Sequence, residues 1–130
     1  MKYGILSDVH ANLEALTAVL ADMRSVGVDK ILCLGDIVGY GPNPVECLEI
    51  AKREFDVVLM GNHEYYEIDP EEIKSIQNRY ARDTFYWTDA ELRKERSVMT
   101  YLKSLPYTHN ISKNGGRNMH FSHGDLVSPK

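Results

Sequence analysis

The sequence has 130 residues, and its 15 Lys and Arg against 19 Asp and Glu give a formal net charge of −4. That length suits one domain, residues 1–130, with a core of its own. A mildly acidic chain lacks the positive excess on which non-specific binding to nucleic acid or anionic membranes depends. Two cysteines are too few for a disulfide framework and favour a reducing, cytoplasmic location. We expect no membrane span and no signal peptide, because no apolar run is long enough for either.

Residues 1–60 alternate between apolar runs, typical of strands, and amphipathic segments, typical of helices. Asn12 is placed to cap a helix that ends at about Gly27, and Pro44 suits the first turn of a second helix. The run at 30–34 is apolar after its lysine, which indicates a strand buried on both faces. The alternation predicts a mostly parallel sheet with flanking helices, an α/β fold. The three strands are expected at 2–7, 30–34 and 56–60.

The second half of the chain predicts more helix and then a β-hairpin. Asp69 begins one helix, and a capping-box pattern at Thr88 begins another that ends at about Ser104. Asn-Gly between two extended segments is a hairpin signal. The strands of the hairpin are expected at 107–112 and 117–121, around a turn at 114–116.

Polar residues that can bind metal ions follow four of the predicted strands. In open α/β sheets, ligands bind outside the carboxyl ends of the strands, so we expect these side chains to meet at one edge. In chain order they are Asp8, His10, Asp36, Asn62, His63 and His123.

The donor groups of this set are carboxylate, carboxamide and imidazole, without thiolate. Such donors favour Mn²⁺, Fe or Zn²⁺ in an open site over a closed structural zinc site. Asp8 and His10 are separated by one residue, so a tight loop can point both at one ion. Asp36 has two carboxylate oxygens and can bridge two ions. A pair of ions about 3.5–4 Å apart is a known device for hydrolysing phosphate esters.

Four motifs carry a family resemblance. They are Asp8-Val9-His10, Gly35-Asp36, Gly61-Asn62-His63-Glu64 and His123-Gly124. In this order they resemble the calcineurin-like metallophosphoesterase superfamily, and their context is closer to its small prokaryotic phosphodiesterases than to its Ser/Thr protein phosphatases. The resemblance implies an α/β/β/α sandwich, of which this chain would form the N-terminal portion. The Gly-His-x-His motif with which the family completes its site has no counterpart in the sequence.

The resemblance also implies a role for each residue. Asp8 and His10 would bind a first metal ion, Asp36 would bridge both ions, and Asn62 and His123 would bind the second. The cofactors would be two divalent ions from among Mn, Fe, Zn and Ni, with Mn favoured.

The implied reaction is hydrolysis of a phosphate ester, most simply a phosphodiester, by a hydroxide that bridges the two ions. The substrate would be a small molecule or a nucleotide. His63 would stabilise the transition state and protonate the leaving oxygen, a role that suits a side chain with a pKa near neutrality. Glu64 would orient His63. Asn12, besides capping a helix, is a candidate for contact with the substrate phosphate.

Two other functions compete with this one. A non-catalytic scaffold on the same fold is the main alternative, because the last metal ligands are absent; the retained ligands count against it. A nucleotide-binding α/β domain is disfavoured, since no G-x-G-x-x-G or P-loop lies between a strand and a helix. A portion of a sandwich would leave an apolar sheet face uncovered, so we expect the chain to self-associate.

Overall fold

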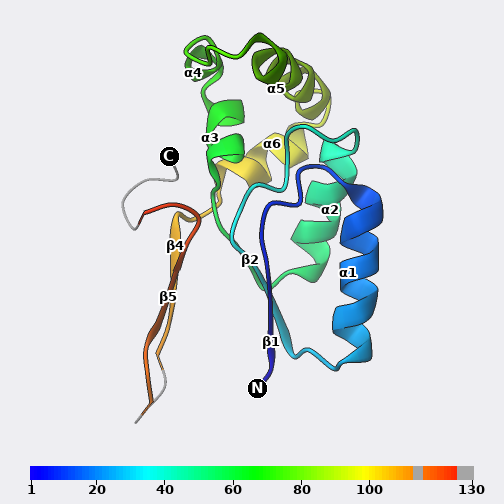
Figure 1. The fold of residues 1–130 in the computed structure, drawn as a ribbon, viewed down its shortest axis with the longest axis vertical. Coiled ribbons are helices and arrows are strands. Elements are labelled where there is room, and N and C mark those ends of the chain that lie inside the picture. Colours follow the sequence, from blue (N-terminus) through cyan, green and yellow to red (C-terminus); the bar gives the residue numbers. More distant parts are fainter. Residues whose placement is uncertain (113–115, 126–130) are drawn as a thin grey trace.

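The computed structural model describes residues 1–112 and 116–125, and its centre is a parallel sheet of three strands (Figure 1). The strands lie in the order β1-β2-β3, and each pair is parallel, as predicted. Leu32 and Cys33 of β2 are buried, which confirms that the middle strand is covered on both faces. The strands are β1 (Tyr3–Leu6), β2 (Lys30–Cys33) and β3 (Val57–Val58).

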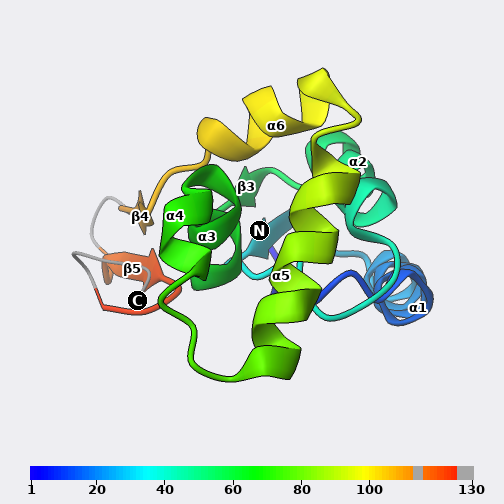
Figure 2. The same ribbon diagram turned by 90° about the horizontal axis from the view of Figure 1, so that it is seen from above.

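Helices α1 (Leu13–Ser25) and α2 (Pro44–Glu54) lie along one side of this sheet (Figure 2). The predicted cap of α1 is confirmed, because the side chain of Asn12 accepts the backbone N–H of Ala15 at 3.0 Å. Pro44 occupies the first turn of α2, where a missing N–H costs nothing. The core between sheet and helices is apolar and includes Leu16, Leu20, Cys33, Cys47, Leu48 and Ala51.

Both cysteines belong to this core. They are free and buried, and burial raises the pKa of each thiol, Cys33 and Cys47, to about 12. Thiols in that state are protonated at neutral pH and act as small apolar side chains.

Helices α3, α4 and α5 lie beyond the carboxyl ends of the parallel strands (Figure 1), and α6 packs against α2 and α3. Helix α4 begins beside Asp69, as predicted, whereas Thr88 does not begin a helix: it lies buried inside α5. The actual cap of α5 is Asn78, whose side chain accepts the N–H of Ala81 at 3.1 Å. The bounds are α3 (Asn62–Ile68), α4 (Pro70–Ile73), α5 (Arg79–Leu92) and α6 (Arg96–Lys103).

The predicted hairpin is confirmed as the antiparallel pair β4 (Thr108–Ile111) and β5 (Met119–Ser122). Most of the turn predicted at 114–116 lies outside the described residues. The hairpin lies on the side of the sheet opposite α1 and α2 (Figures 1 and 2).

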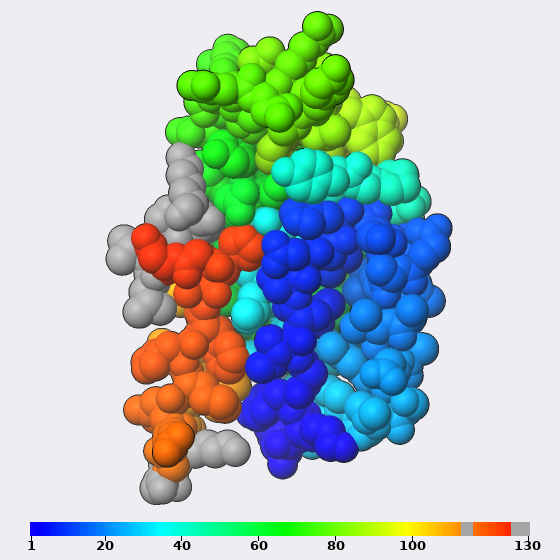
Figure 3. Space-filling model, in the orientation of Figure 1, coloured from blue at the N-terminus to red at the C-terminus, as the bar shows by residue number. Residues whose placement is uncertain are grey.

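A hollow separates the hairpin from the parallel sheet. Figure 3 shows it between β1, in dark blue, and the hairpin, in orange. Its volume is about 480 Å³, and its walls include Tyr3 and Leu32 from the sheet and Ile111 from the hairpin. None of the helices in the described part of the chain has both the length and the apolar character needed to cross a membrane.

Candidate metal centre

The six candidate residues come together at one end of the parallel sheet. Asp8 and His10 follow β1, Asp36 follows β2, and α3 begins with Asn62. His63 is the next residue of α3, and His123 follows β5, so it reaches the site from the hairpin and not from the parallel sheet. The predicted meeting point is therefore correct, although one of its contributors comes from a second sheet.

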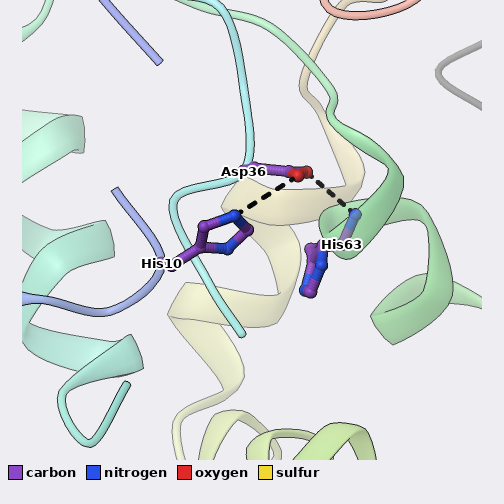
Figure 4. Close-up of side chains that lie close together, drawn as sticks. All are labelled: His10, Asp36 and His63. Atoms are coloured by element: carbon purple, nitrogen blue, oxygen red, sulfur yellow. Dashed lines mark hydrogen bonds and ion pairs between the residues drawn. The ribbon is translucent and has the colours of Figure 1, made fainter. Parts of the chain in front are cut away.

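Asp36 is the centre of this arrangement (Figure 4). Its Oδ1 atom accepts the backbone N–H of His63 at 3.0 Å. Its Oδ2 atom faces the imidazoles, 3.8 Å from Nε2 of His10 and 3.3 Å from Nε2 of His123. Burial raises the pKa of the Asp36 carboxyl, and the bond from His63 opposes that shift. One oxygen is thus fixed by the backbone, while the other is directed into the site.

Backbone carbonyl groups set the direction of two imidazoles. Nδ1 of His10 lies 3.1 Å from the carbonyl oxygen of Val38. Nδ1 of His123 lies 3.0 Å from the carbonyl oxygen of Leu34. Because a carbonyl oxygen can only accept, each Nδ1 must carry the hydrogen, and in the neutral ring each Nε2 keeps its lone pair. Proteins commonly orient metal-binding imidazoles in this way.

Both Nε2 atoms face oxygen atoms. His123 Nε2 lies 3.1 Å from Oδ1 of Asn62 and 3.3 Å from Oδ2 of Asp36. His10 Nε2 lies 3.6 Å from Oδ1 of Asp8. Lone pairs that face one another repel unless a cation lies among them, so the donor set fits a divalent metal ion.

Among residues 1–112 and 116–125, two overlapping groups of three side chains place their ligand atoms within 4.8 Å of one another. The first group agrees with the predicted ligands. The second includes His63, to which the resemblance gave a role other than metal binding. The groups are Asp8, Asp36 and His123, and His10, Asp36 and His63.

Backbone strain is concentrated at this site. Among the described residues, five other than glycine have positive φ angles, a conformation that side chains with a Cβ rarely adopt. They are Asp8 (57°), His10 (48°), Ala11 (55°), Asp36 (55°) and Tyr40 (61°). Asp8, His10 and Asp36 are predicted metal ligands, so the strained backbone lies in the loops that carry these donors.

Glu64 fixes the loop that carries Asp36. Its fully buried carboxylate accepts backbone N–H groups from Asp36 at 2.8 Å, Ile37 at 2.7 Å and Val38 at 3.1 Å. It also accepts the N–H of Gly61 at 2.9 Å. Burial raises the pKa of this carboxyl, and the backbone N–H groups oppose the shift. Glu64 therefore positions the loop after β2, and its role in orienting His63, which the family resemblance implied, stays a prediction.

His63 lies in an aromatic enclosure that sequence reasoning missed. Its ring stacks on Phe85 with centroids 4.6 Å apart, and it meets His10 and Tyr40 edge-on at 4.6 and 4.7 Å. Its Nδ1 atom has no hydrogen-bond partner among residues 1–112 and 116–125. Burial, aided by the neighbouring imidazoles, lowers the pKa of His63 to about 4. An anionic phosphoester beside the ring would act in the opposite direction, since negative charge favours the imidazolium.

The chain is similar to known proteins over most of its length. A family model described as calcineurin-like phosphoesterase matches residues 1–128. "Uncharacterized protein MJ0912" from Methanocaldococcus jannaschii is 39% identical over 128 residues, which cover 98% of this chain and 51% of the relative. Serine/threonine-protein phosphatase 2 from Salmonella typhimurium is 26% identical over 99 residues, which cover 75% of this chain and 45% of the relative.

A solved structure of a metallophosphoesterase is also similar to this chain. The crystal structure of a metallophosphoesterase from Sphaerobacter thermophilus superposes with a TM-score of 0.69 at 41% identity, covering 84% of this chain and 43% of that chain. The chain thus spans about half the length of these relatives. On the evidence of the family model and of the donor cluster, the chain belongs to the calcineurin-like phosphoesterase family.

Proposed function

We propose that this protein is a metal-dependent phosphoesterase and that its preferred substrate is a phosphodiester. The observation that carries the proposal is the cluster of lone pairs around Asp36, in which Nε2 of His123 lies 3.3 Å from a carboxylate oxygen. When both imidazoles are neutral, their Nε2 lone pairs face carboxylate oxygens, and a cation among these acceptors would relieve the repulsion. A site of that kind supports a cationic cofactor, and the family supports the phosphoester.

The family resemblance divides the donors into two sets around one shared carboxylate, that of Asp36. In that division Asp8 and His10 would hold one ion, Asn62 and His123 would hold the other, and Asp36 would contact both. Two divalent ions in these positions, with Mn²⁺ favoured, would polarise the phosphoryl group and lower the pKa of a bound water. The chain itself fixes where the phosphoryl group lies, because the donors are held by backbone carbonyl groups and by strained loops.

His63 is proposed as the general acid that protonates the leaving oxygen. Its neighbours restrict the plane of the ring: Phe85 covers one face, and His10 and Tyr40 stand against it edge-on. A fixed ring delivers its proton along one direction, which is what proton transfer to a bound ester requires. Asn12 lies in the loop after β1 beside the donors and is proposed as a contact for the substrate phosphate.

A non-catalytic scaffold on the same fold is the alternative. A scaffold has no use for a strained cluster of metal donors, so the structure gives this reading less support.

The two cysteines bear on the location of the protein. Both are free and buried, which supports a reducing compartment such as the cytoplasm.

Hydrolysis of bis(4-nitrophenyl) phosphate in the presence of Mn²⁺ tests the catalytic proposal. We expect Mn²⁺-dependent release of nitrophenolate by the wild type and loss of that release in Asp36→Ala. Asp29→Ala, a change at an exposed aspartate far from the site, is the matched control and should behave as the wild type. Equal background rates for the wild type and Asp36→Ala would reject catalysis by this chain and leave the scaffold.

Self-association through the side of the sheet that carries the hairpin is a further part of the proposal. Ile5 of β1 is 50% exposed. The hollow between the sheet and the hairpin lies beside it and is partly apolar. An exposed strand edge next to apolar surface is a common route to association between copies of a chain.

A further inference from the structure

A second pocket opens beside the metal centre, under helix α5. Its volume is about 290 Å³, at the lower end of the roughly 300–1,000 Å³ that small-molecule pockets span. None of its lining residues is charged, and the hydroxyl of Thr84 already donates to the carbonyl of Ala81 at 2.6 Å. The lining residues are Tyr40, Gly41, Pro42, Thr84 and Trp87.

Tyr40 joins this pocket to the candidate active site. Its ring lies edge-on to His10 at 4.9 Å and to His63 at 4.7 Å, measured between ring centroids. The same side chain is 57% exposed and lines the pocket. It is also held at a φ of 61°, a strained conformation for a bulky residue. A group that occupies the pocket would therefore be separated from His63 by the ring of Tyr40.

Trp87 is a second aromatic residue that lines the pocket. It lies on α5, the helix that runs across the end of the molecule in Figure 2. Its side chain is 45% exposed, although tryptophan is usually well buried. Partly exposed aromatic side chains that line a small uncharged pocket are the kind of surface on which proteins stack planar ligands.

We propose that this pocket binds a planar aromatic group of the substrate, a nucleobase or an aryl ester group, while the phosphoryl group lies at the metal centre. The proposal rests on the phosphoesterase function and adds a substrate class to it. Tyr40 and Trp87 bind the ring by stacking, so substrates that lack an aromatic group lose this contact.

Binding equilibria test the pocket separately from catalysis. The ligands are adenosine 5′-monophosphate, phenyl phosphate and ribose 5-phosphate, titrated by calorimetry in the presence of Mn²⁺. Trp87 is the single tryptophan of the sequence, so quenching of its fluorescence reports directly on the pocket. We expect adenosine 5′-monophosphate to bind about tenfold more tightly than ribose 5-phosphate, the size of one stacking contact, and to quench the fluorescence saturably. Phenyl phosphate distinguishes a pocket for any ring from one that needs the larger nucleobase.

The variant Trp87→Ala should remove the tenfold preference. Its matched control is Tyr86→Ala, since Tyr86 is the adjacent residue of α5 and is equally exposed at 44%, but does not line the pocket. Equal affinity of the wild type for adenosine 5′-monophosphate and ribose 5-phosphate overturns the proposal, as does an equal effect of the two variants. Adenosine has no phosphate, so quenching of Trp87 by adenosine supports the pocket even where Mn²⁺ binding and hydrolysis both fail. If the chain hydrolyses the phosphodiester but binds adenosine 5′-monophosphate no more tightly than ribose 5-phosphate, the pocket proposal is rejected and the phosphoesterase proposal stands.

Discussion

The carboxylate of Glu64 accepts the backbone N–H of Asp36 at 2.8 Å, so a fully buried side chain of α3 fixes the backbone of the residue at the centre of the metal site. A second hydrogen bond runs in the other direction, because Oδ1 of Asp36 accepts the backbone N–H of His63, the neighbour of Glu64 in α3, at 3.0 Å. The loop after β2 and the start of α3 thus hold each other through two acidic side chains. Metal binding at this site would therefore be coupled to the folding of this region.

Replacement of Glu64 by glutamine tests that coupling. The amide keeps the size of the side chain but turns one acceptor oxygen into a donor, which faces backbone N–H groups. We expect the free energy of unfolding to fall by about 1–3 kcal/mol, the cost of buried polar groups left unpaired. Affinity for Mn²⁺ should fall by about 10–100-fold, as for other residues that support metal ligands.

Urea denaturation and Mn²⁺ calorimetry measure the two effects. Glu71→Gln is the control, since Glu71 is exposed and its ion pair with Lys74 is a surface one. Equal stability and Mn²⁺ affinity in the two variants would show that Glu64 does not support the site.

Gly39 should tolerate no side chain, because a Cβ atom there would lie 2.0 Å from Nδ1 of His63. Gly27 offers a matched comparison: its φ is also positive, at 68° against 90° for Gly39, but a Cβ atom there would meet no described atom within 4 Å. We expect Gly27→Ala to cost about 1–2 kcal/mol of stability, from its backbone conformation alone. Gly39→Ala should cost more and displace the ring of His63. A thermal or urea denaturation series that gave both variants the same stability would contradict the packing described around His63.

Glu67 should make the fold less stable as the pH rises. Burial, aided by Asp89, raises the pKa of this carboxyl from 4.5 to about 9, and neither of its oxygens has a hydrogen-bond partner in the described part of the chain. Between these two values the folded chain holds a proton that the unfolded chain has released. The contribution of protonated Glu67 to the free energy of unfolding is therefore complete below pH 4.5 and is lost as the pH rises through 9. Within this window the free energy of unfolding should fall by about 1.4 kcal/mol per pH unit because of this group.

Glu67→Gln removes the titration and keeps the shape of the side chain. Urea denaturation at several pH values within this window should give a steeper decline for the wild type than for the variant. Parallel curves for the two proteins would mean that Glu67 is already ionised in the fold.

Self-association should depend on the exposed side of the sheet. Ile5→Lys places a charge on β1 and should shift the chain towards a monomer in sedimentation velocity experiments. Val26→Lys is the control, because Val26 is also 50% exposed but follows α1, away from that face. A wild-type chain that sediments as a monomer at all concentrations would reject the association.

Much of the site could be predicted because its donors follow strands, and a parallel sheet brings strand ends together. The positions of Asp8 and Asp36 directly after β1 and β2 predict that their side chains lie at the same end of the sheet, which the structure confirms. The enclosure of His63 could not be predicted in this way, since Phe85 reaches it from a helix more than twenty residues away in the sequence. That contact depends on tertiary packing, which periodicity does not encode.

Helix boundaries show the same limit. Helix α3 begins after Gly61, which has no side chain to cap it, so the usual signal is missing. The remaining signal was Glu64, three residues further on, where a capping box places its acidic member. Thr88 carried a capping pattern that the structure does not use, because Asn78 caps α5 earlier in the chain and Thr88 is buried within that helix.

Binding of divalent metal ions by Asp36 and its neighbours is the central claim. Calorimetric titration of the metal-free chain with Mn²⁺ measures this most directly, with Asp36→Asn beside the wild type. We predict two ions per wild-type chain and a large loss of affinity in the variant, whose carboxamide can no longer bridge them. An absence of binding by the wild type, or equal binding by both proteins, would contradict this claim.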